Sequence, residues 1–162
     1  MASVLLLYSE EQTEDLMKHL TKFIALLILV TAVAACSGSK EKYTKISPEN
    51  GKLYIPLKQV SYGAAHYFTV NSNGKEIKFF VLKSRDGVVR AAFDACDVCF
   101  PEKKGYRQEG EFMICNNCGQ KFHSSRINVV KGGCNPSPLA REAKGDHLEI
   151  SMSDVATGTR YF

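Results

Sequence analysis

The chain has 162 residues and a formal net charge of +4, and 44% of its residues are hydrophobic. This length and composition suffice for one ordinary hydrophobic core plus an appendage. The positive charge is small and dispersed, and no basic run is interleaved with aromatic residues, so the sequence argues against a nucleic-acid-binding protein. We find no Ser-His-Asp set, paired carboxylates, HExxH helix or phosphate-binding glycine motif, so nothing in the sequence argues for hydrolysis.

The N-terminal region has the pattern of an export signal. Residues 17–22 form a basic start, residues 23–33 are an apolar core, and Val33-Ala34-Ala35 supplies the small residues that a signal peptidase needs before Cys36. The stretch from 23 to 35 is too short for a membrane span, which takes about twenty residues. We therefore predict a signal peptide over residues 1–35, with Met17 as the true start.

A cysteine at the predicted cut, followed by Ser37-Gly38-Ser39, resembles the lipobox of bacterial lipoproteins. This resemblance implies a lipidated Cys36 as the first mature residue, whereas ordinary secretion with cleavage nearby is the alternative. Residues 36–46 would then form a flexible tether, and residues 47–162 a β-rich metal-binding domain. We expect an extracytoplasmic protein, held through lipid on Cys36 at the periplasmic or cell-surface side of a bacterial membrane.

Short β-forming stretches and tight turns alternate along the rest of the chain. Turns at residues 73–74, 86–87 and 109–110 each end in glycine and favour hairpins. The sequence predicts one helical turn at residues 140–144. The expected strands are residues 53–57, 65–70, 76–83, 88–93, 106–108, 111–114, 127–130 and 148–152. This pattern predicts an all-β fold, an antiparallel meander.

Two Cys-x-x-Cys pairs stand out in the sequence. Cys96 and Cys99 are separated from Cys115 and Cys118 by a fifteen-residue spacer, which is the length of a hairpin. Each pair can fold over a metal ion as a knuckle, and together they supply the four thiolates of a tetrahedral site. Gly119 follows the second pair, where a knuckle backbone often turns left-handed. We predict a metal site at these four cysteines, with disulfides or a redox-active pair as the alternative in an oxidising compartment.

Two further residues are candidates for this site. Cys134 lies in a loop rich in glycine and proline, and it could be a fifth ligand, a reactive thiol or a disulfide partner. His123 follows Cys118 by five residues and could replace a thiolate or donate to one, the alternative being a surface or supporting histidine.

A longer string of residues surrounds the cysteines. It consists of Ala95-Cys96-Asp97-Val98-Cys99, Lys103-Lys104-Gly105-Tyr106, Gln108, Gly110, Met113-Ile114-Cys115-Asn116-Asn117-Cys118-Gly119, Phe122 and Gly132-Gly133-Cys134-Asn135-Pro136-Ser137-Pro138-Leu139. This string resembles the FtrD-like family of membrane-associated iron-sulfur proteins, over roughly residues 50–160. The resemblance implies iron-sulfur chemistry and an association with ferrous-iron transport. By motif position it implies Cys96, Cys99, Cys115 and Cys118 as ligands, with Cys134 a further candidate.

The order of strands, knuckles and a Gly-Pro loop is also loosely similar to Rieske domains. Rieske domains place two histidines on one iron, whereas both pairs here are cysteines, as in a zinc ribbon. An all-thiolate 2Fe-2S centre would have a lower reduction potential than a Rieske centre.

The sequence leaves the metal open. The resemblance implies an iron-sulfur cluster or a single iron ion. Residues 17–22 contain no twin arginine, so we expect the chain to be exported unfolded. An iron-sulfur cluster assembled in the cytoplasm could not be exported with an unfolded chain. Zinc and copper are the alternatives, because thiolates favour soft ions and Met113 offers a thioether two residues before Cys115.

The leading hypothesis is a lipid-anchored protein for electron transfer or metal handling, with a membrane iron-transport or redox partner. One alternative is an interaction domain with a structural zinc ion. Another is a thiol-disulfide redox protein. The sequence argues against it, because neither cysteine pair lies in a thioredoxin-like βαβ pattern.

Overall fold

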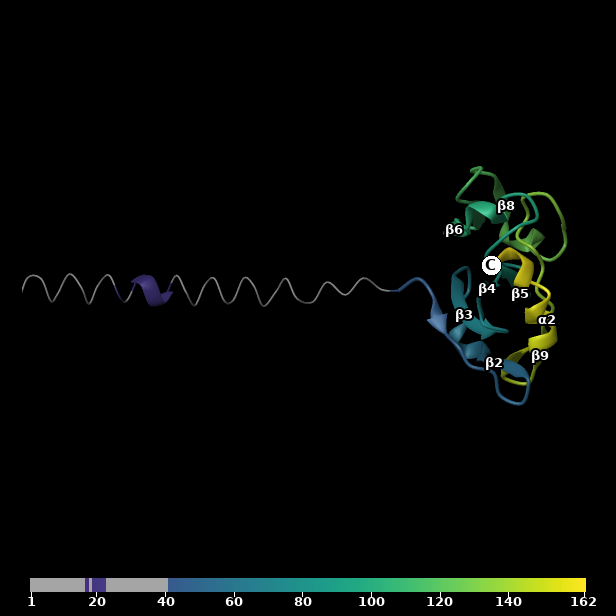
Figure 1. Ribbon diagram of the computed structural model, residues 1–162, viewed down its shortest axis with the longest axis horizontal. Helices are drawn as coiled ribbons and strands as arrows, with labels where there is room; N and C mark the ends of the chain where they lie inside the picture. The colour runs from purple at the N-terminus through teal and green to yellow at the C-terminus, as the bar shows by residue number, and fades with distance from the viewer. Residues whose placement is uncertain (1–16, 18, 23–40) are drawn as a thin grey trace, which may run out of the picture. The chain divides into compact units, whose positions relative to one another are not determined.

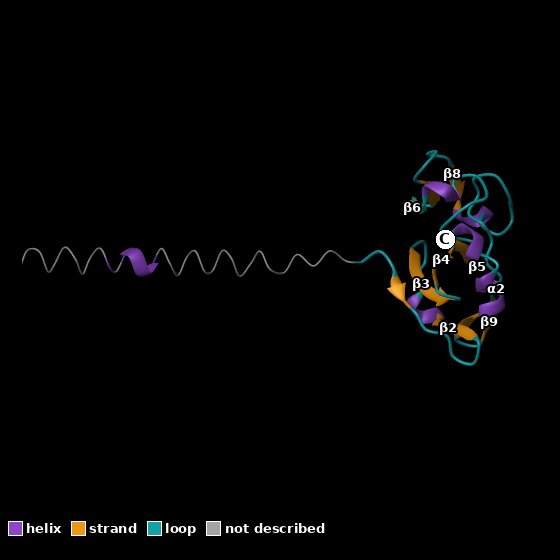
Figure 2. Ribbon diagram, viewed as in Figure 1, coloured by secondary structure: helices purple, strands orange, loops and turns teal. Residues whose placement is uncertain are grey.

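The computed structural model describes Met17, residues 19–22 and residues 41–162. Met17 and residues 19–22 are helical, and residues 41–162 make up one folded unit (Figures 1 and 2). The predicted cleavage site, Cys36 and the first part of the predicted tether lie outside the described residues. Among the residues that are described, no helix has the length and hydropathy needed to cross a membrane.

Residues 41–162 contain three small β-sheets, which confirms the predicted all-β class (Figure 2). The strands are β1 (Thr44–Lys45), β2 (Lys52–Pro56), β3 (Ala65–Ser72), β4 (Lys75–Lys83), β5 (Val89–Phe93), β6 (Tyr106–Glu109), β7 (Phe112–Cys115), β8 (Lys121–His123), β9 (Glu142–Lys144) and β10 (His147–Ser151). The sheet orders are β1-β3-β4-β5, β2-β10-β9 and β6-β7-β8. Every strand pair is antiparallel except β1 with β3.

Short helices connect or follow these strands. They are the 3₁₀ helices η1 (Leu57–Gln59), η2 (Phe100–Glu102), η3 (Ser124–Arg126) and η4 (Thr159–Tyr161), and the α-helix α2 (Met152–Ala156). The β3–β4 hairpin shows why the predicted turns form. Asn73 and Gly74 both have positive φ, at 53° and 78°, as a two-residue hairpin turn requires.

Strands β4 and β5 separate two hydrophobic clusters. Side chains on one face, Phe79 and Val81 among them, pack into the larger cluster. Phe80 and Leu82 face the other way, into a smaller cluster that contains cysteines. Burial on both faces explains why residues 77–82 of β4 are almost continuously apolar instead of alternating. The cysteine-bearing part of the fold is thus built on the far side of the strands that form the main core.

The strand predicted at residues 127–130 is wrong, because these residues form a turn. Side-chain hydrogen bonds tie this turn to strand β5 in place of strand pairing. The guanidinium of Arg90 donates to the carbonyl oxygens of Ser125 and Ile127, at 3.0 and 2.9 Å. The amide of Asn128, whose φ is 67°, bonds the backbone N–H and C=O of Ala91.

Two predictions near the C-terminus are also wrong. Residues 142–144 form strand β9 instead of a helical turn, because a turn through Gly145, with φ of 58°, returns the chain as β10. Met152 does not continue β10. The hydroxyl of Ser151 accepts a hydrogen bond from the backbone N–H of Asp154 at 3.1 Å, so Ser151 caps helix α2 and ends the strand.

Part of the predicted tether, residues 41–46, packs on the domain. Strand β1 pairs with β3, with Thr44 opposite Phe68. Just before β1, the ammonium of Lys42 lies 2.7 Å from the carboxylate of Asp94, and the hydroxyl of Tyr43 lies 2.5 Å from the same oxygen. Asp94 is buried, and its other oxygen accepts a 2.6 Å hydrogen bond from the backbone N–H of Tyr106. One carboxylate therefore joins the start of the folded unit to β6.

Gly105 lies directly against this carboxylate. A Cβ atom at Gly105 would lie 2.5 Å from the nearest oxygen of Asp94, and its φ is 61°. We predict that Gly105→Ala destabilises the fold by about 3 kcal/mol, from backbone strain plus overpacking. Urea unfolding measures this loss.

Gly110→Ala is the matched control, because Gly110 has a similar φ of 57° but nothing within 4 Å of an added Cβ. We expect that substitution to cost about 1 kcal/mol, from backbone strain alone. Equal losses for the two variants would show that contact with Asp94 does not constrain position 105.

Candidate metal centre

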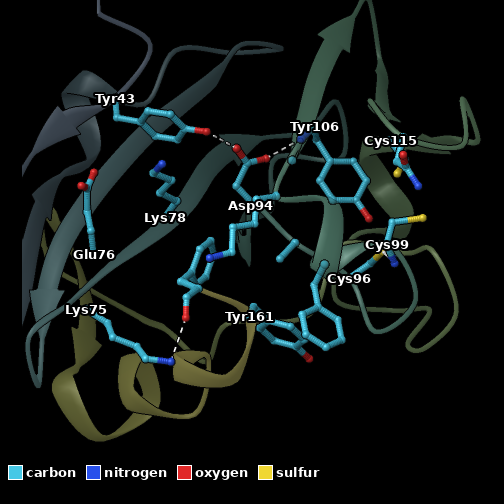
Figure 3. Close-up of a pocket in the computed structure, with 16 residues that line it drawn as sticks. Tyr43, Lys75, Glu76, Lys78, Asp94, Cys96, Cys99, Tyr106, Cys115 and Tyr161 are labelled. Carbon is cyan, nitrogen blue, oxygen red and sulfur yellow. Dashed lines mark hydrogen bonds between the residues drawn. The ribbon is translucent and has the colours of Figure 1, made fainter.

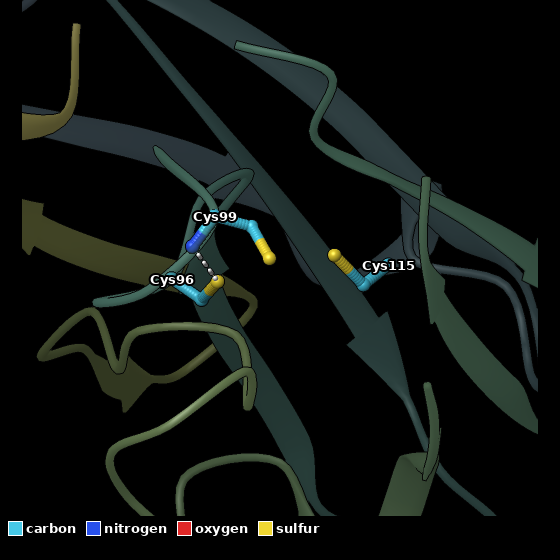
Figure 4. A group of neighbouring side chains, drawn as sticks. All are labelled: Cys96, Cys99 and Cys115. Atoms are coloured by element: carbon cyan, nitrogen blue, oxygen red, sulfur yellow. Dashed lines mark hydrogen bonds between the residues drawn. The ribbon is translucent and has the colours of Figure 1, made fainter. Parts of the chain in front are cut away.

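The first knuckle follows β5 directly. The backbone N–H of Asp94 bonds the carbonyl oxygen of Lys78 at 2.9 Å, which extends the sheet up to the knuckle. The chain then folds back, so that the backbone N–H of Cys99 donates to Sγ of Cys96 at 3.2 Å (Figure 4). Helix η2 starts at the next residue. Cys96 is thereby buried in the smaller hydrophobic cluster, while Cys99 is half-buried.

The second knuckle starts where β7 ends, at Cys115. The backbone N–H of Gly119 donates to the carbonyl oxygen of Cys115 at 2.9 Å, and Gly119 has a φ of 74°. The left-handed glycine expected after this pair is thus confirmed. The side chain and the backbone N–H of Asn116 donate to the carbonyl oxygens of Lys104 and Gly105, each at 2.9 Å. These bonds tie the second knuckle to the loop that follows the first.

All five cysteines of residues 41–162 are free thiols. Their sulfur atoms form two groups of three, and within each group all sulfurs lie within 4.8 Å of one another. The first group is Cys96, Cys99 and Cys115, which Figure 4 shows converging from the two knuckles. The second group is Cys99, Cys118 and Cys134. The structure thus brings all four predicted knuckle cysteines and Cys134 together, with Cys99 common to both groups.

The loop that carries Cys134 is held over the knuckles by long-range hydrogen bonds. The hydroxyl of Tyr106 donates to the carbonyl oxygen of Cys134 at 2.6 Å. The backbone N–H of Ser137 donates to the carbonyl oxygen of Ala95 at 2.9 Å. As a result, Sγ of Cys134 lies 3.7 Å from Sγ of Cys99.

The thiols differ in acidity. Burial raises the pKa of Cys115 to about 11, although backbone N–H groups of the same knuckle oppose the shift. Burial and the neighbouring thiols also raise the pKa of Cys134. By contrast, the pKa of the exposed Cys118 is lowered, chiefly by the backbone N–H of Gln120. Since soft cations bind thiolates, metal binding at Cys115 and Cys134 would replace protons.

A cavity of about 220 Å³ adjoins the first group. Its walls combine aromatic rings with lysines, two carboxylates and three cysteines. The residues that line it are Tyr43, Lys75, Glu76, Lys78, Asp94, Ala95, Cys96, Cys99, Phe100, Lys103, Gly105, Tyr106, Cys115, Asn117, Tyr161 and Phe162 (Figure 3). Every cysteine of the first group therefore borders a space that a small molecule or solvent can enter.

His123 lies outside both cysteine groups. Its Nε2 is 3.1 Å from a carboxylate oxygen of Glu111, and its Nδ1 is 2.8 Å from the hydroxyl of Ser125. Met113 is fully buried in the smaller cluster, beside Cys96 and Cys115. Sequence reasoning missed Asp94. Its only signal was a carboxylate directly after the buried strand β5 and two residues before a knuckle.

The donor set fits a soft metal. Five free thiols converge, and backbone N–H groups point at sulfurs of both knuckles. Thiolates of this kind bind iron, zinc and Cu(I), and they hold iron-sulfur clusters. The cysteine cluster is therefore compatible with a metal or iron-sulfur site.

Comparisons with known proteins bear on this cluster. No curated protein matches the chain. Among solved structures, the chain is similar to the quaternary ammonium Rieske monooxygenase CntA in complex with an inhibitor, with 16% identity and a TM-score of 0.41. That match covers 61% of this chain and 30% of the monooxygenase chain, so the chain spans less than a third of that protein. Residues 60–162, which contain all five described cysteines, match the family described as "Membrane iron-sulfur containing protein FtrD-like". The chain therefore belongs to the FtrD-like family of membrane iron-sulfur containing proteins.

Proposed function

We propose that this protein is an extracytoplasmic lipoprotein whose metal centre transfers electrons, or handles metal, for a membrane system that transports ferrous iron. Cys96, Cys99, Cys115 and Cys118 are the ligands of that centre. The observation that carries the proposal is the convergence of the two knuckles as free thiols in a chain of an iron-sulfur family.

The surroundings of the cysteines suit electron transfer better than a purely structural role. Cys96 and Cys115 are buried among apolar and aromatic side chains. Cys118 is exposed, and the adjoining cavity reaches three of the sulfurs. A centre that is buried on one side and accessible on another can exchange electrons or ions with a partner. When bound, iron would supply the redox chemistry, and the protein would fix its thiolate ligands.

The anchor belongs to the same proposal. Lipid on Cys36 would stand five residues before Glu41, where the folded unit starts. Five residues span at most about 18 Å. The domain would therefore stay close to the membrane surface, within reach of an iron-transport or redox partner in the same membrane.

The direct test is to purify the full chain from bacterial membranes, expressed with its own N-terminal region. The proposal expects bound iron and visible absorption from thiolate-to-iron charge transfer, which changes on reduction. A colourless, redox-silent protein that contains zinc would contradict electron transfer and favour the interaction domain with a structural ion. Metal-free protein with stable disulfides would contradict the metal centre itself.

Removal of a knuckle ligand is predicted to remove the metal. Cys99→Ser should lower the metal content of the purified protein at least tenfold, because Cys99 is half-buried among the other sulfurs and belongs to both groups. His123→Gln is the control, since His123 contacts Glu111 and Ser125 and lies outside both groups. That variant should keep its metal. Metal content is measured by elemental analysis, and loss in both variants would argue against the assigned ligands.

Metal removal should expose thiols of unequal reactivity. In chelated, reduced protein at pH 8, we expect iodoacetamide to modify Cys118 first, because that thiol is exposed and its pKa is lowered. Cys115 should react much more slowly than Cys118. Its pKa of about 11 leaves only about one thiol in a thousand ionised at pH 8, and its rate should rise about tenfold per pH unit up to that pKa. Peptide mass spectrometry gives both rates, and equal rates would contradict the acidities described above.

A further inference from the structure

The five cysteine sulfurs fall into two overlapping groups. With metal-to-sulfur bonds of about 2.3 Å, four sulfurs around one tetrahedral ion lie about 3.8 Å apart. The structure has two groups whose sulfurs all lie within 4.8 Å of one another, and neither contains all four knuckle cysteines. Cys118 lies in the group of Cys134, not in that of Cys96 and Cys115. Cys99 alone belongs to both.

We propose that the centre is binuclear, with five thiolate ligands and Cys99 bridging two divalent thiophilic ions. The inner ion is bound by Cys96, Cys99 and Cys115, and the outer ion by Cys99, Cys118 and Cys134. This proposal rests on the proposed metal-binding function. It adds Cys134 as a ligand and fixes the number of ions at two.

The position of Cys134 is built into the fold. Its Sγ lies 3.7 Å from Sγ of Cys99, about the spacing of two sulfurs on one ion. The hydroxyl that holds its carbonyl oxygen belongs to Tyr106, which is itself buried beside Cys96 and Cys115. In strand β6, Tyr106 pairs with Cys115. The residue that positions Cys134 is thus part of the inner group's own surroundings.

Charge also favours a second ion. Five thiolates around one divalent ion would leave three negative charges in a half-buried site, which is costly. A second divalent ion reduces this excess to one. Among the contacts described for residues 41–162, no lysine or arginine pairs with a cysteine sulfur. After the first knuckle, the next basic residue in the sequence is Lys103, which lines the cavity. Metal ions are therefore the natural counter-charges.

The two ions would have different surroundings. Cys96 and Cys115 of the inner group are buried, and the inner group borders the 220 Å³ cavity. The outer group contains the exposed Cys118, and neither Cys118 nor Cys134 lines that cavity. Because Cys118 is exposed while Cys96 and Cys115 are buried, we expect the outer ion to exchange with bulk solution more readily, whereas the cavity gives a small molecule access to the inner ion.

The test uses Cd²⁺ on the full chain after chelation and reduction. Native mass spectrometry should find two Cd²⁺ per wild-type chain, and cadmium-113 NMR should show two resonances split by coupling through a shared thiolate. Cys118→Ser should bind one ion and lose the splitting, and its exposed position puts the fold at little risk. Cys134→Ser should likewise bind one ion. His123→Gln should bind two.

Several results would overturn the binuclear proposal. One ion in the wild type, unchanged in Cys134→Ser but lost in Cys118→Ser, would mean a mononuclear site made of the two knuckles. That outcome would leave the proposed function intact. Native protein with two irons and two acid-labile sulfides per chain would mean that sulfide, not Cys99, bridges the irons. A wild-type chain that binds no ion would overturn both the binuclear proposal and the proposed function.

Discussion

The carboxylate of Asp94 is the contact on which the arrangement of the metal centre depends. It is buried, and it accepts hydrogen bonds from the hydroxyl of Tyr43 and the backbone N–H of Tyr106 (Figure 3). It also accepts a hydrogen bond from the ammonium of Lys42. A buried carboxylate without partners would cost several kcal/mol, so the three groups are held to it. Asp94 lies two residues before Cys96, and Tyr106 pairs with Cys115. The Asp94 carboxylate therefore helps to position both knuckles, the first through the chain that leads to Cys96 and the second through Tyr106.

Strands β4 and β5 contribute side chains to both hydrophobic clusters, one on each face. The face that carries Phe79 and Val81 packs with β2, β10 and α2 into the larger cluster, and that cluster contains no cysteine. The opposite face supports the smaller cluster around Cys96 and Cys115. The larger cluster contains twice as many buried residues, so it supplies most of the apolar burial. Most of the apolar burial therefore lies outside the cysteine-bearing part of the fold.

The sequence predicts those features that depend on neighbours along the chain. Glycines in tight turns define the β3–β4 hairpin, and Cys-x-x-Cys spacing with Gly119 defines the second knuckle. It fails where a side-chain hydrogen bond to the backbone decides the local structure, because such a bond leaves no hydrophobic periodicity in the sequence. The Asn128 amide replaces a strand at residues 127–130, and the Ser151 cap turns Met152 into a helix. Asp94 and the placement of Cys134 depend on Lys42 and Tyr106, and neither contact has a sequence periodicity.

The acidities and exposures of the cysteines together argue for an asymmetric centre. Cys115 is buried and its pKa is raised, so an ion must displace its proton on binding. Cys118 is exposed and more easily ionised, so it meets an arriving ion first. Cys99 belongs to both sulfur groups and offers a path from the outer thiols to the inner ones. If it binds metal as proposed, a site ordered in this way would load from its exposed edge and retain most firmly the ion that reaches its buried thiols, as the proposed exchange with a partner requires.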